Sequence, residues 1–372
     1  MAQSIAEQTS ADTVTLHRVN TPLAQTWNYL RANDITLTVP KLSRKGDVYF
    51  ALPQLYRKIE CGMGEQVTEW VTSQAADATY VEVRRGEHRA DPIVVDVDSD
   101  AGTVRDTGIM LREGSSATVV VIAHGTGTAE ATSASLLRIV AEKRARLTLV
   151  EIVAETDAIQ HLESVGIDAD DDAVLDVRQY LLGGGKVAVG FAANLAGDRA
   201  RIELNTRYLA RQSEVLDINH VVRQRGENTR AQINESGVLA DAAQKSLRAT
   251  IDLIHGGKGS KGNEAETVLV TGDDIVNKTM PVILCDEDDV QGNHGATIGS
   301  IGPAQMQYLR DRGLSTREAE DLYVRAIFDD ATINAPTDAA RQAVLARAAE
   351  VLGQEIAHDL SDGLFLQAEE EA

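Results

Sequence analysis

The chain has 372 residues and a formal net charge of −21, which arises from 57 acidic and 36 basic side chains. Nucleic acids and anionic membrane surfaces are bound by clustered Lys and Arg, so this charge argues against both as partners. The length exceeds that of one ordinary core and predicts two or three domains. Aromatic residues make up 4% of the chain and hydrophobic residues 43%, so the interior must be built from aliphatic side chains.

Two cysteines, Cys61 and Cys285, are too few for a disulfide framework or for an all-cysteine structural zinc site. The N-terminal residues lack the basic and apolar regions of a signal peptide. No uninterrupted apolar run approaches membrane-spanning length. We therefore expect a cytoplasmic protein without membrane insertion.

Residues 1–79 are predicted to form an N-terminal domain of helical or mixed structure. Residues 1 to about 18 are polar and are expected to be loose. Pro22 then opens a helical pattern, because proline is tolerated in the first turn of a helix. A second short helix is expected to begin at Pro53. The apolar residues that share one face of the first helix are Leu23, Trp27 and Leu30.

Residues 80–301 are predicted to form a β-solenoid core. From Tyr80 onward, β-branched segments bounded by Gly, Asp and Ser are typical of strands, although 159–167 fits a short helix as well. From about Asp176, apolar residues recur at a spacing of roughly 15 to 18 positions, as the stacked segments of a solenoid require. A β-sandwich remains an alternative. The recurring residues are Ile202, Ile218, Ile233, Ile251, Val268, Ile283 and Ile298.

Two glycine-rich segments, 182–187 and 255–261, invite interpretation as phosphate-binding loops. Lys186 is followed by Val187 and Lys258 by Gly259, so neither matches the pattern in which Ser or Thr follows the lysine. Both are interpreted as turns of the solenoid. We therefore expect no nucleotide to be bound by this chain and no ATP hydrolysis.

Residues 302–372 are predicted to form a C-terminal helical domain. A helix within 305–312 ends at Gly313, and the capping box 315–318 starts the next helix. A third helix follows Pro336. An apolar stripe usually packs against its own domain, and the alternative is that it binds a partner. The stripe of the second helix consists of Ala319, Leu322, Tyr323, Ala326 and Ile327.

The segment 285–299 concentrates side chains that bind transition metals. Cys285 is followed by four acids, and His294 lies between glycines. Cys285 ends an apolar run, so it fits a small buried hydrophobe as well as a ligand. The acids fit a solvated turn as well as a ligand set, with Asp288 as a candidate. His294 fits a metal ligand or an interface residue.

The chain resembles the SufB/SufD family of iron-sulfur cluster assembly proteins, and its SufD-like members in particular. The resemblance is carried by Asp288–Gly299, by Gln307–Ala319 and, more locally, by Thr26–Leu30. In SufB-like members an essential cysteine precedes a strand similar to 267–270. Here the corresponding position is about Ala265, which favours a SufD role over a SufB role.

The resemblance implies a right-handed parallel β-helix between two helical domains. It also implies a complex with SufB and with the ABC-type ATPase SufC, in which SufC docks on the C-terminal helices. His294 matches a SufD histidine at the interface with SufB, where a transient cluster forms, and Cys285 and Asp288 are further candidate ligands. The chain is then a non-catalytic subunit. The residues predicted to bind the partner in the helices are Ser315, Glu318, Leu322 and Ile327.

Two other functional hypotheses for the segment 285–299 remain open. One is a carbohydrate-active β-helix enzyme, a lyase or hydrolase, that uses Asp286, Asp288 and Asp289 as paired carboxylates or calcium ligands. The missing secretion signal counts against this reading. The other, within the family, is a homodimeric scaffold that serves without a separate SufB.

Overall fold

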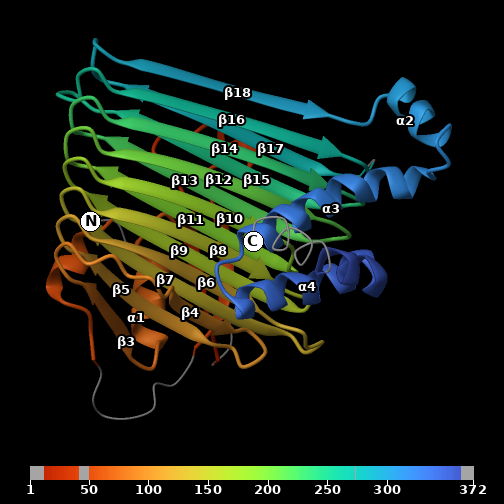
Figure 1. The fold of residues 1–372 in the computed structure, drawn as a ribbon, viewed down its shortest axis with the longest axis horizontal. Helices are drawn as coiled ribbons and strands as arrows, with labels where there is room; N and C mark the ends of the chain where they lie inside the picture. Colours follow the sequence, from red (N-terminus) through yellow and green to blue (C-terminus); the bar gives the residue numbers. More distant parts are fainter. Residues whose placement is uncertain (1–11, 42–49, 273, 362–372) are drawn as a thin grey trace, which may run out of the picture.

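The computed structural model describes residues 12–41, 50–272 and 274–361, and its central part is a parallel β-solenoid of about eight turns (Figure 1). Two eight-stranded sheets face each other, and the chain alternates between them. The even-numbered sheet contains β4 (Ile93–Asp98), β6 (Ser116–His124), β8 (Arg146–Ala154), β10 (Val174–Leu181), β12 (Arg201–Ala210), β14 (Arg230–Leu239), β16 (Lys261–Val270) and β18 (Gln291–Gly299). The odd-numbered sheet contains β3 (Ala78–Val83), β5 (Val104–Leu111), β7 (Ala131–Ala141), β9 (Ile159–Ala169), β11 (Lys186–Leu195), β13 (Val215–Gln224), β15 (Gln244–Leu253) and β17 (Val276–Cys285). The predicted β-helix is confirmed, and the sandwich alternative is wrong.

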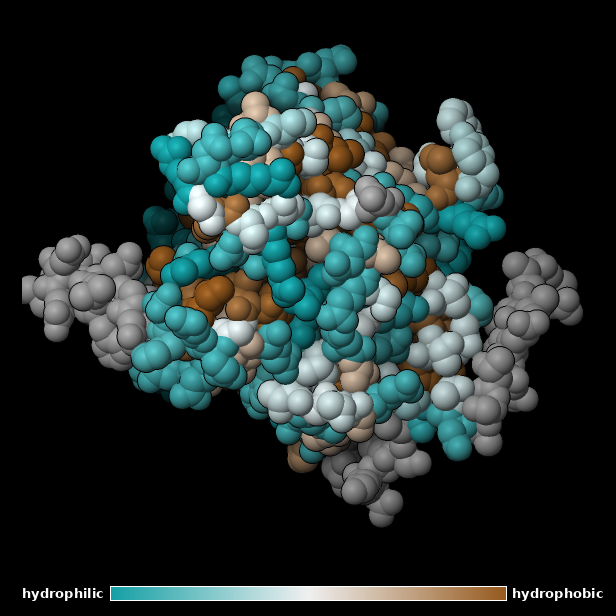
Figure 2. Space-filling view, turned by 90° about the vertical axis from the view of Figure 1, so that its right-hand side faces the viewer, coloured by the Kyte–Doolittle hydropathy of each residue, from teal (hydrophilic) through white to brown (hydrophobic). Residues whose placement is uncertain are grey.

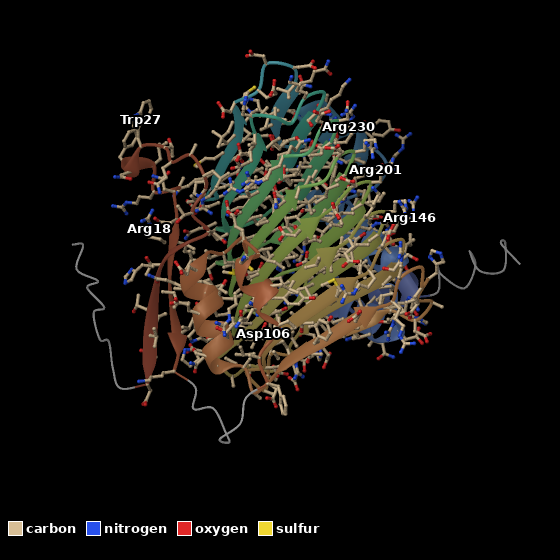
Figure 3. All side chains as sticks on the ribbon, turned by 90° about the vertical axis from the view of Figure 1, so that its left-hand side faces the viewer. Arg18, Trp27, Asp106, Arg146, Arg201 and Arg230 are labelled. Atoms are coloured by element: carbon tan, nitrogen blue, oxygen red, sulfur yellow. The ribbon has the colours of Figure 1, made fainter. Side chains whose placement is uncertain are left out.

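The spacing of the recurring apolar residues in the sequence corresponds to half a turn of the solenoid. Each of these residues lies on a different strand from β12 to β18, so successive residues belong to opposite sheets. A full turn separates residues that pair directly within one sheet, as Arg201 pairs with Arg230, Arg230 with Lys261 and Lys261 with Gln291. Figure 3 shows Arg146, Arg201 and Arg230, the first residues of β8, β12 and β14, stacked along the axis of the solenoid.

The core lies between the two sheets and is mainly aliphatic, as the composition requires. Side chains alternate between the two faces of a strand, so every second residue points inward. Stacking in register turns this alternation into columns of buried side chains along the axis. One such column of the even-numbered sheet consists of Val119, Leu149, Val177, Leu204 and Ile233.

The two glycine-rich segments are turns of the solenoid, as predicted. Residues 182–185 connect β10 with β11, and residues 254–260 connect β15 with β16. Gly183 has a positive φ of 132°, a conformation that side chains other than glycine rarely adopt. Neither segment precedes a helix, so neither has the geometry of a phosphate-binding loop.

The N-terminal part differs from the prediction. β1 (Thr13–Val19) and β2 (Ile35–Pro40) form an antiparallel pair, so the expectation of a loose segment to residue 18 is wrong for 13–18. The helix expected from Pro22 is also absent, and a 3-10 helix, η1 (Asn28–Leu30), is all that forms. The side chain of Asn33 holds this loop together by accepting from Thr26 N at 2.6 Å and donating to Thr26 O at 2.8 Å.

The segment predicted to start a helix at Pro53 forms a 3-10 helix, η2 (Gln54–Lys58), and the α-helix α1 (Glu65–Gln74) follows it. Val67, Trp70 and Val71 of α1 are buried with β1, β2 and the outer face of the odd-numbered sheet. Tertiary contacts therefore stabilise structure that local sequence patterns did not indicate.

The C-terminal part contains α2 (Pro303–Arg310), α3 (Thr316–Asn334) and α4 (Asp338–Leu352), followed by helical residues 354–361. The predicted capping box is present, because Ser315 Oγ accepts from Glu318 N and Glu318 Oε2 accepts from Ser315 N. α3 and α4 pack on the outer face of the even-numbered sheet (Figure 1). The division into three domains at 79 and 301 stays a prediction.

Candidate functional site at the open end of the solenoid

The solenoid ends in two strands that no further turn covers. β17 and β18 each bond to one neighbouring strand, β15 and β16, and β18 forms the upper edge in Figure 1. All nine residues of β18 are exposed, and Ile298 is 61% exposed. An edge strand presents a row of backbone N–H and C=O groups that are available to pair with another chain. The terminal turn is therefore one of two places where the sheets have open edges, the other being the first turn, in which β3 and β4 also bond to one neighbour each.

His294 lies on the inner side of this terminal turn. It pairs in register with Glu264 of β16, and Glu264 pairs with Ile233 of β14. Glu264 is 4% exposed, whereas Ala265 beside it is exposed, so the Glu264 side chain points into the solenoid. His294 continues the same column and faces the same way. The column is aliphatic up to Ile233 and becomes Glu and then His in the last two strands.

The imidazole of His294 has no hydrogen-bond or ion-pair partner among the residues that the structure describes. Adjacent strands of a sheet are about 4.8 Å apart, so His294 and Glu264 are direct neighbours. The other residues of β18 that face inward are Gly292, Ala296 and Ile298, which carry no ligand group. His294 is thus the single metal-binding side chain on the inner face of this strand.

Cys285 occupies the last position of β17 and is exposed. Its Sγ lies 3.3 Å from the carbonyl oxygen of Glu287. The interpretation of Cys285 as a buried core residue is wrong. The apolar run that precedes it does form a strand, but the strand is the last of its sheet, so no further turn of the solenoid covers it.

The structure does not bring Cys285 and His294 together. The chain reverses direction through 286–290, and a Cβ atom on Gly292 would lie 2.9 Å from Cγ2 of Ile283. Cys285 lies two residues from this contact toward the turn, and His294 lies two residues from it in the opposite direction. The two residues are therefore separated by four strand positions, which correspond to roughly 13 Å along the strands. Among the described residues, no three His, Cys, Asp or Glu side chains are placed to hold one metal ion.

The acids of 286–289 form the exposed turn between β17 and β18. The carboxylate of Glu287 accepts from Gly256 N at 2.9 Å and from Asp288 N at 3.1 Å, and these bonds lower its pKa. Asp286, Asp288 and Asp289 are exposed. Asp288 therefore lies at the end of the turn where Cys285 is, away from His294. This arrangement is that of a solvated turn.

A buried polar cluster lies directly below the terminal turn. The carboxylate of Glu266 is bonded to Lys245 Nζ, accepts from Tyr208 OH at 2.7 Å and accepts from Thr279 Oγ1 at 2.6 Å. Burial lowers the pKa of Lys245, while its contact with Glu266 acts in the opposite direction.

Glu235 and Glu264 complete this cluster. Oε1 of Glu235 is 2.9 Å from Nδ1 of His220, and both side chains are fully buried. Burial raises the pKa of each carboxyl to about 8, and repulsion between neighbouring carboxylates adds to the effect. Burial lowers the pKa of His220 to about 3, so its imidazole is neutral. Neither carboxyl oxygen of Glu264 accepts a hydrogen bond from a donor in the described residues.

The sequence contains a signal for this cluster in the spacing of two acids. Glu264 and Glu266 are two positions apart in a segment that also contains Gly262 and Val268. Strand periodicity places all four on one face, and the buried Val268 marks that face as the inner one. Acids on a buried face are unusual and indicate a site more strongly than the exposed acids of 286–289.

The residues predicted to bind a partner in the helices are divided by the structure. Ser315 and Glu318 form the cap of α3, and Leu322 is 46% exposed. Ile327 is buried between α3 and the solenoid and is not available to a partner. α2 has no buried residue. Figure 2 shows the side of the molecule that is on the right in Figure 1, where hydrophilic residues separate smaller apolar patches.

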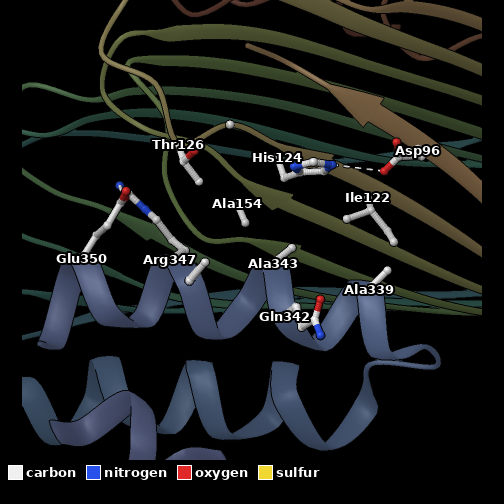
Figure 4. A pocket seen from close by; sticks show the side chains of 12 residues that line it. Asp96, Ile122, His124, Thr126, Ala154, Ala339, Gln342, Ala343, Arg347 and Glu350 are labelled. Atoms are coloured by element: carbon white, nitrogen blue, oxygen red, sulfur yellow. Dashed lines mark hydrogen bonds and ion pairs between the residues drawn. The ribbon is translucent and has the colours of Figure 1, made fainter. Parts of the chain in front are cut away.

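A pocket lies between α4 and the solenoid (Figure 4). His124 Nε2 lies 3.1 Å from Asp96 Oδ1 at one end of it, and Arg347 lies at the other end. Arg347 is already bonded to Glu214 at 2.7 Å and to the carbonyl oxygen of Leu182 at 3.1 Å. The pocket therefore lies where Arg347 attaches α4 to the solenoid.

Among the helices in the described ranges, none combines the length and the apolar composition that crossing a membrane requires.

Comparison with known proteins gives one consistent family. Residues 94–327, more than half of the chain, match the family model described as SUF system FeS cluster assembly, SufBD core domain. Iron-sulfur cluster assembly protein SufD of Escherichia coli is 24% identical over 283 residues, which are 74% of this chain and 67% of that protein. SufD of Bacillus subtilis is 26% identical over 153 residues, 41% of this chain and 35% of that protein. A SufBD family protein of Mycobacterium leprae is 28% identical over 284 residues, 72% of this chain and 71% of that protein.

Proposed function

The chain belongs to the SufB/SufD family, as a SufD-like member with a role in iron-sulfur cluster assembly, and from this premise we propose that it pairs with a SufB-like chain through its terminal turn. The observation that carries the proposal is the inward-facing His294 on a turn whose two strands are both edge strands. A second solenoid that continues the sheets would satisfy the exposed backbone groups. It would also cover Ile298 and bring its own side chains next to His294.

His294 is the residue that we assign to cluster assembly. A cluster requires about four protein ligands, and they are usually cysteines. The inner face of β18 supplies one imidazole, and Cys285 is at the far end of β17. The remaining ligands therefore come from the partner, and the cluster is a transient cargo shared between two chains. Cys285 and Asp288 receive no role in this proposal.

The C-terminal helices are assigned to docking of a SufC-like ATPase. α2 and the exposed side of α3 carry Tyr308, Leu322 and Tyr323, which are 54%, 46% and 43% exposed. The glycine-rich segments of this chain are solenoid turns, so the energy of ATP hydrolysis is supplied by the partner. The chain itself is a non-catalytic scaffold subunit.

Recovery of the complex tests the proposal. A tagged chain, purified without oxygen from its native cells, is expected to bring down a SufB-like chain and a SufC-like ATPase in stoichiometric amounts. His294→Ala is expected to leave these partners bound and to lower the number of clusters formed per complex. An unchanged cluster yield in an intact complex removes His294 from the site. Recovery of neither partner contradicts the proposed assembly.

The homodimeric alternative makes a different prediction for the same preparation. Two copies of this chain joined through β17 and β18 give a particle of twice 40.0 kDa without a SufB-like chain. The native mass of the particle distinguishes the two assemblies. The carbohydrate-active alternative is not supported, because its candidate acids lie in an exposed turn.

A further inference from the structure

We propose that Glu264 and His294 together form half of a divalent metal site that receives iron(II) as a substrate of assembly. The inference rests on the proposed role of His294 and adds a second ligand to it from the same chain. The other half of the coordination shell is supplied by water or by the partner that covers the terminal turn. The reaction is metal binding only and involves no redox step.

The register of the strands brings the two ligands together. Glu264 and His294 are one full turn of the solenoid apart and are directly paired on β16 and β18. Both side chains point to the inner face, and their strands are about 4.8 Å apart. Metal ions bind imidazole nitrogen and carboxylate oxygen at about 2.0–2.2 Å, which holds the two atoms roughly 3 Å from each other. Neighbouring side chains of this length reach that separation by rotation about their χ angles.

Glu264 is the carboxylate of the cluster that has no donor of its own. Glu266 is bonded to Lys245, and Glu235 is paired with His220. Both oxygens of Glu264 are buried without a hydrogen-bond donor among the described residues, and the residue is 4% exposed. A buried polar group normally has a partner, because desolvation without one costs about 1–3 kcal/mol. The side chain that Glu264 does contact, Glu235, is itself an acid, so a cation held with His294 is the partner that this geometry lacks.

The chemistry of the two side chains fits a cation in this place. Imidazole and carboxylate together are a donor set that suits iron(II). The strand before β16 in this sheet has Ile233 at the same position, so the pair exists in the last turn alone.

Anaerobic titration of the full-length chain with cobalt(II), a spectroscopic substitute for iron(II), tests the inference. The wild-type chain is expected to bind one equivalent with the absorption bands of nitrogen and oxygen ligation. Glu264→Gln and His294→Ala are each expected to weaken this binding by roughly tenfold or more. Glu203→Gln is the matched control, because Glu203 is exposed on the outer face of β12 in the same sheet.

Binding that is absent from the wild type, or that persists in Glu264→Gln with the wild-type affinity, excludes Glu264 as a ligand. Glu264→Asp keeps the charge and shortens the side chain, so it is expected to weaken binding too and serves if Glu264→Gln does not fold. Recovery of the SufB-like and SufC-like partners is measured on the same variants. A chain that recovers both partners but binds no cobalt(II) retains the proposed function and loses this inference.

Discussion

The hydroxyl of Tyr208 donates a 2.7 Å hydrogen bond to Oε1 of Glu266, although Tyr208 is on β12, Glu266 is on β16 and β14 lies between them. The phenol ring passes over Gly237 of β14, where a Cβ atom would lie 2.2 Å from the ring carbon Cδ2. A strand position without a side chain therefore lets Tyr208 reach the polar cluster below the terminal turn. Burial raises the pKa of Tyr208, and its contact with the Glu266 carboxylate adds to the effect.

Gly237→Ala is expected to displace the Tyr208 ring and to lower the free energy of unfolding by about 1–3 kcal/mol, the usual cost of overpacking a core. Chemical denaturation measures this loss. Gly299→Ala is the control, because a Cβ atom there meets nothing within 4 Å. Equal stability of Gly237→Ala and the wild type contradicts the assignment of the close contact.

Arg347 attaches α4 to the solenoid through Glu214, and both side chains are buried at 6% and 3% exposure. Arg347→Met leaves Glu214 without its cationic partner, so we expect a loss of about 3–5 kcal/mol in the free energy of unfolding. Faster hydrogen exchange in α4 than in β10 identifies detachment of the helix as the cause.

The double variant Arg347→Met with Glu214→Gln is expected to recover part of this loss, because no unpaired carboxylate remains. Burial raises the pKa of Glu214 to about 7 even though Arg347 lowers it, and loss of Arg347 raises it further, so the deficit of Arg347→Met is expected to grow as the pH rises above 7 and the unpaired carboxyl ionises. A deficit that is the same at pH 6 and pH 8 contradicts this explanation.

Stability is expected to decrease as the pH rises above 6.5. Burial raises the pKa of Glu163 to about 8, while the carboxyl of the unfolded chain titrates near 4.5. The folded state therefore holds more protons between these values, and the stabilisation present below 4.5 is lost as the pH rises through about 8. Each such proton lowers the free energy of unfolding by about 1.4 kcal/mol for every unit of increase in pH.

Glu163→Gln is expected to make this slope shallower in denaturation curves recorded between pH 6.5 and 8. Glu151 faces Glu163 and has a raised pKa as well, so part of the slope remains. His161 is 3.2 Å from Glu163, and burial lowers its pKa to about 4, so its titration affects stability below pH 6.5. Glu203→Gln on the exposed face of β12 is the control and is expected to keep the wild-type slope.

Leu322 and Ile327 are expected to respond differently to a charge. Leu322→Glu places the charge on the exposed side of α3 and is expected to weaken binding of the SufC-like ATPase while the fold is retained. Ile327→Glu buries an unpaired charge between α3 and the solenoid and is expected to destabilise the chain. Binding and circular dichroism are measured on both variants. Unchanged ATPase binding by Leu322→Glu removes this side of α3 from the docking surface.

The sequence alone determined the elements whose signals are local. The alternation of apolar residues predicted the strands and their stacking, because inward and outward positions differ by one residue. The half-turn spacing from Ile202 to Ile298 predicted the solenoid, and the capping box at Ser315 predicted the start of α3. The pattern that joins His294 to its flanking glycines also carried the resemblance to the family, which the comparisons confirm. In each case the signal lies within one strand, one helix cap or the short interval between successive strands.

The tertiary structure decided the features that depend on how the turns of the solenoid stack. Cys285 ends an apolar run that is typical of a buried strand, and it is exposed because no turn follows it. Asn20 lies between two segments that local patterns assigned wrongly, and its amide donates to Asp217, 197 residues away, at 2.7 Å. The pair of His294 and Glu264 exists because one full turn separates them. Register between distant strands sets these environments, and no local pattern encodes register across a full turn of the solenoid.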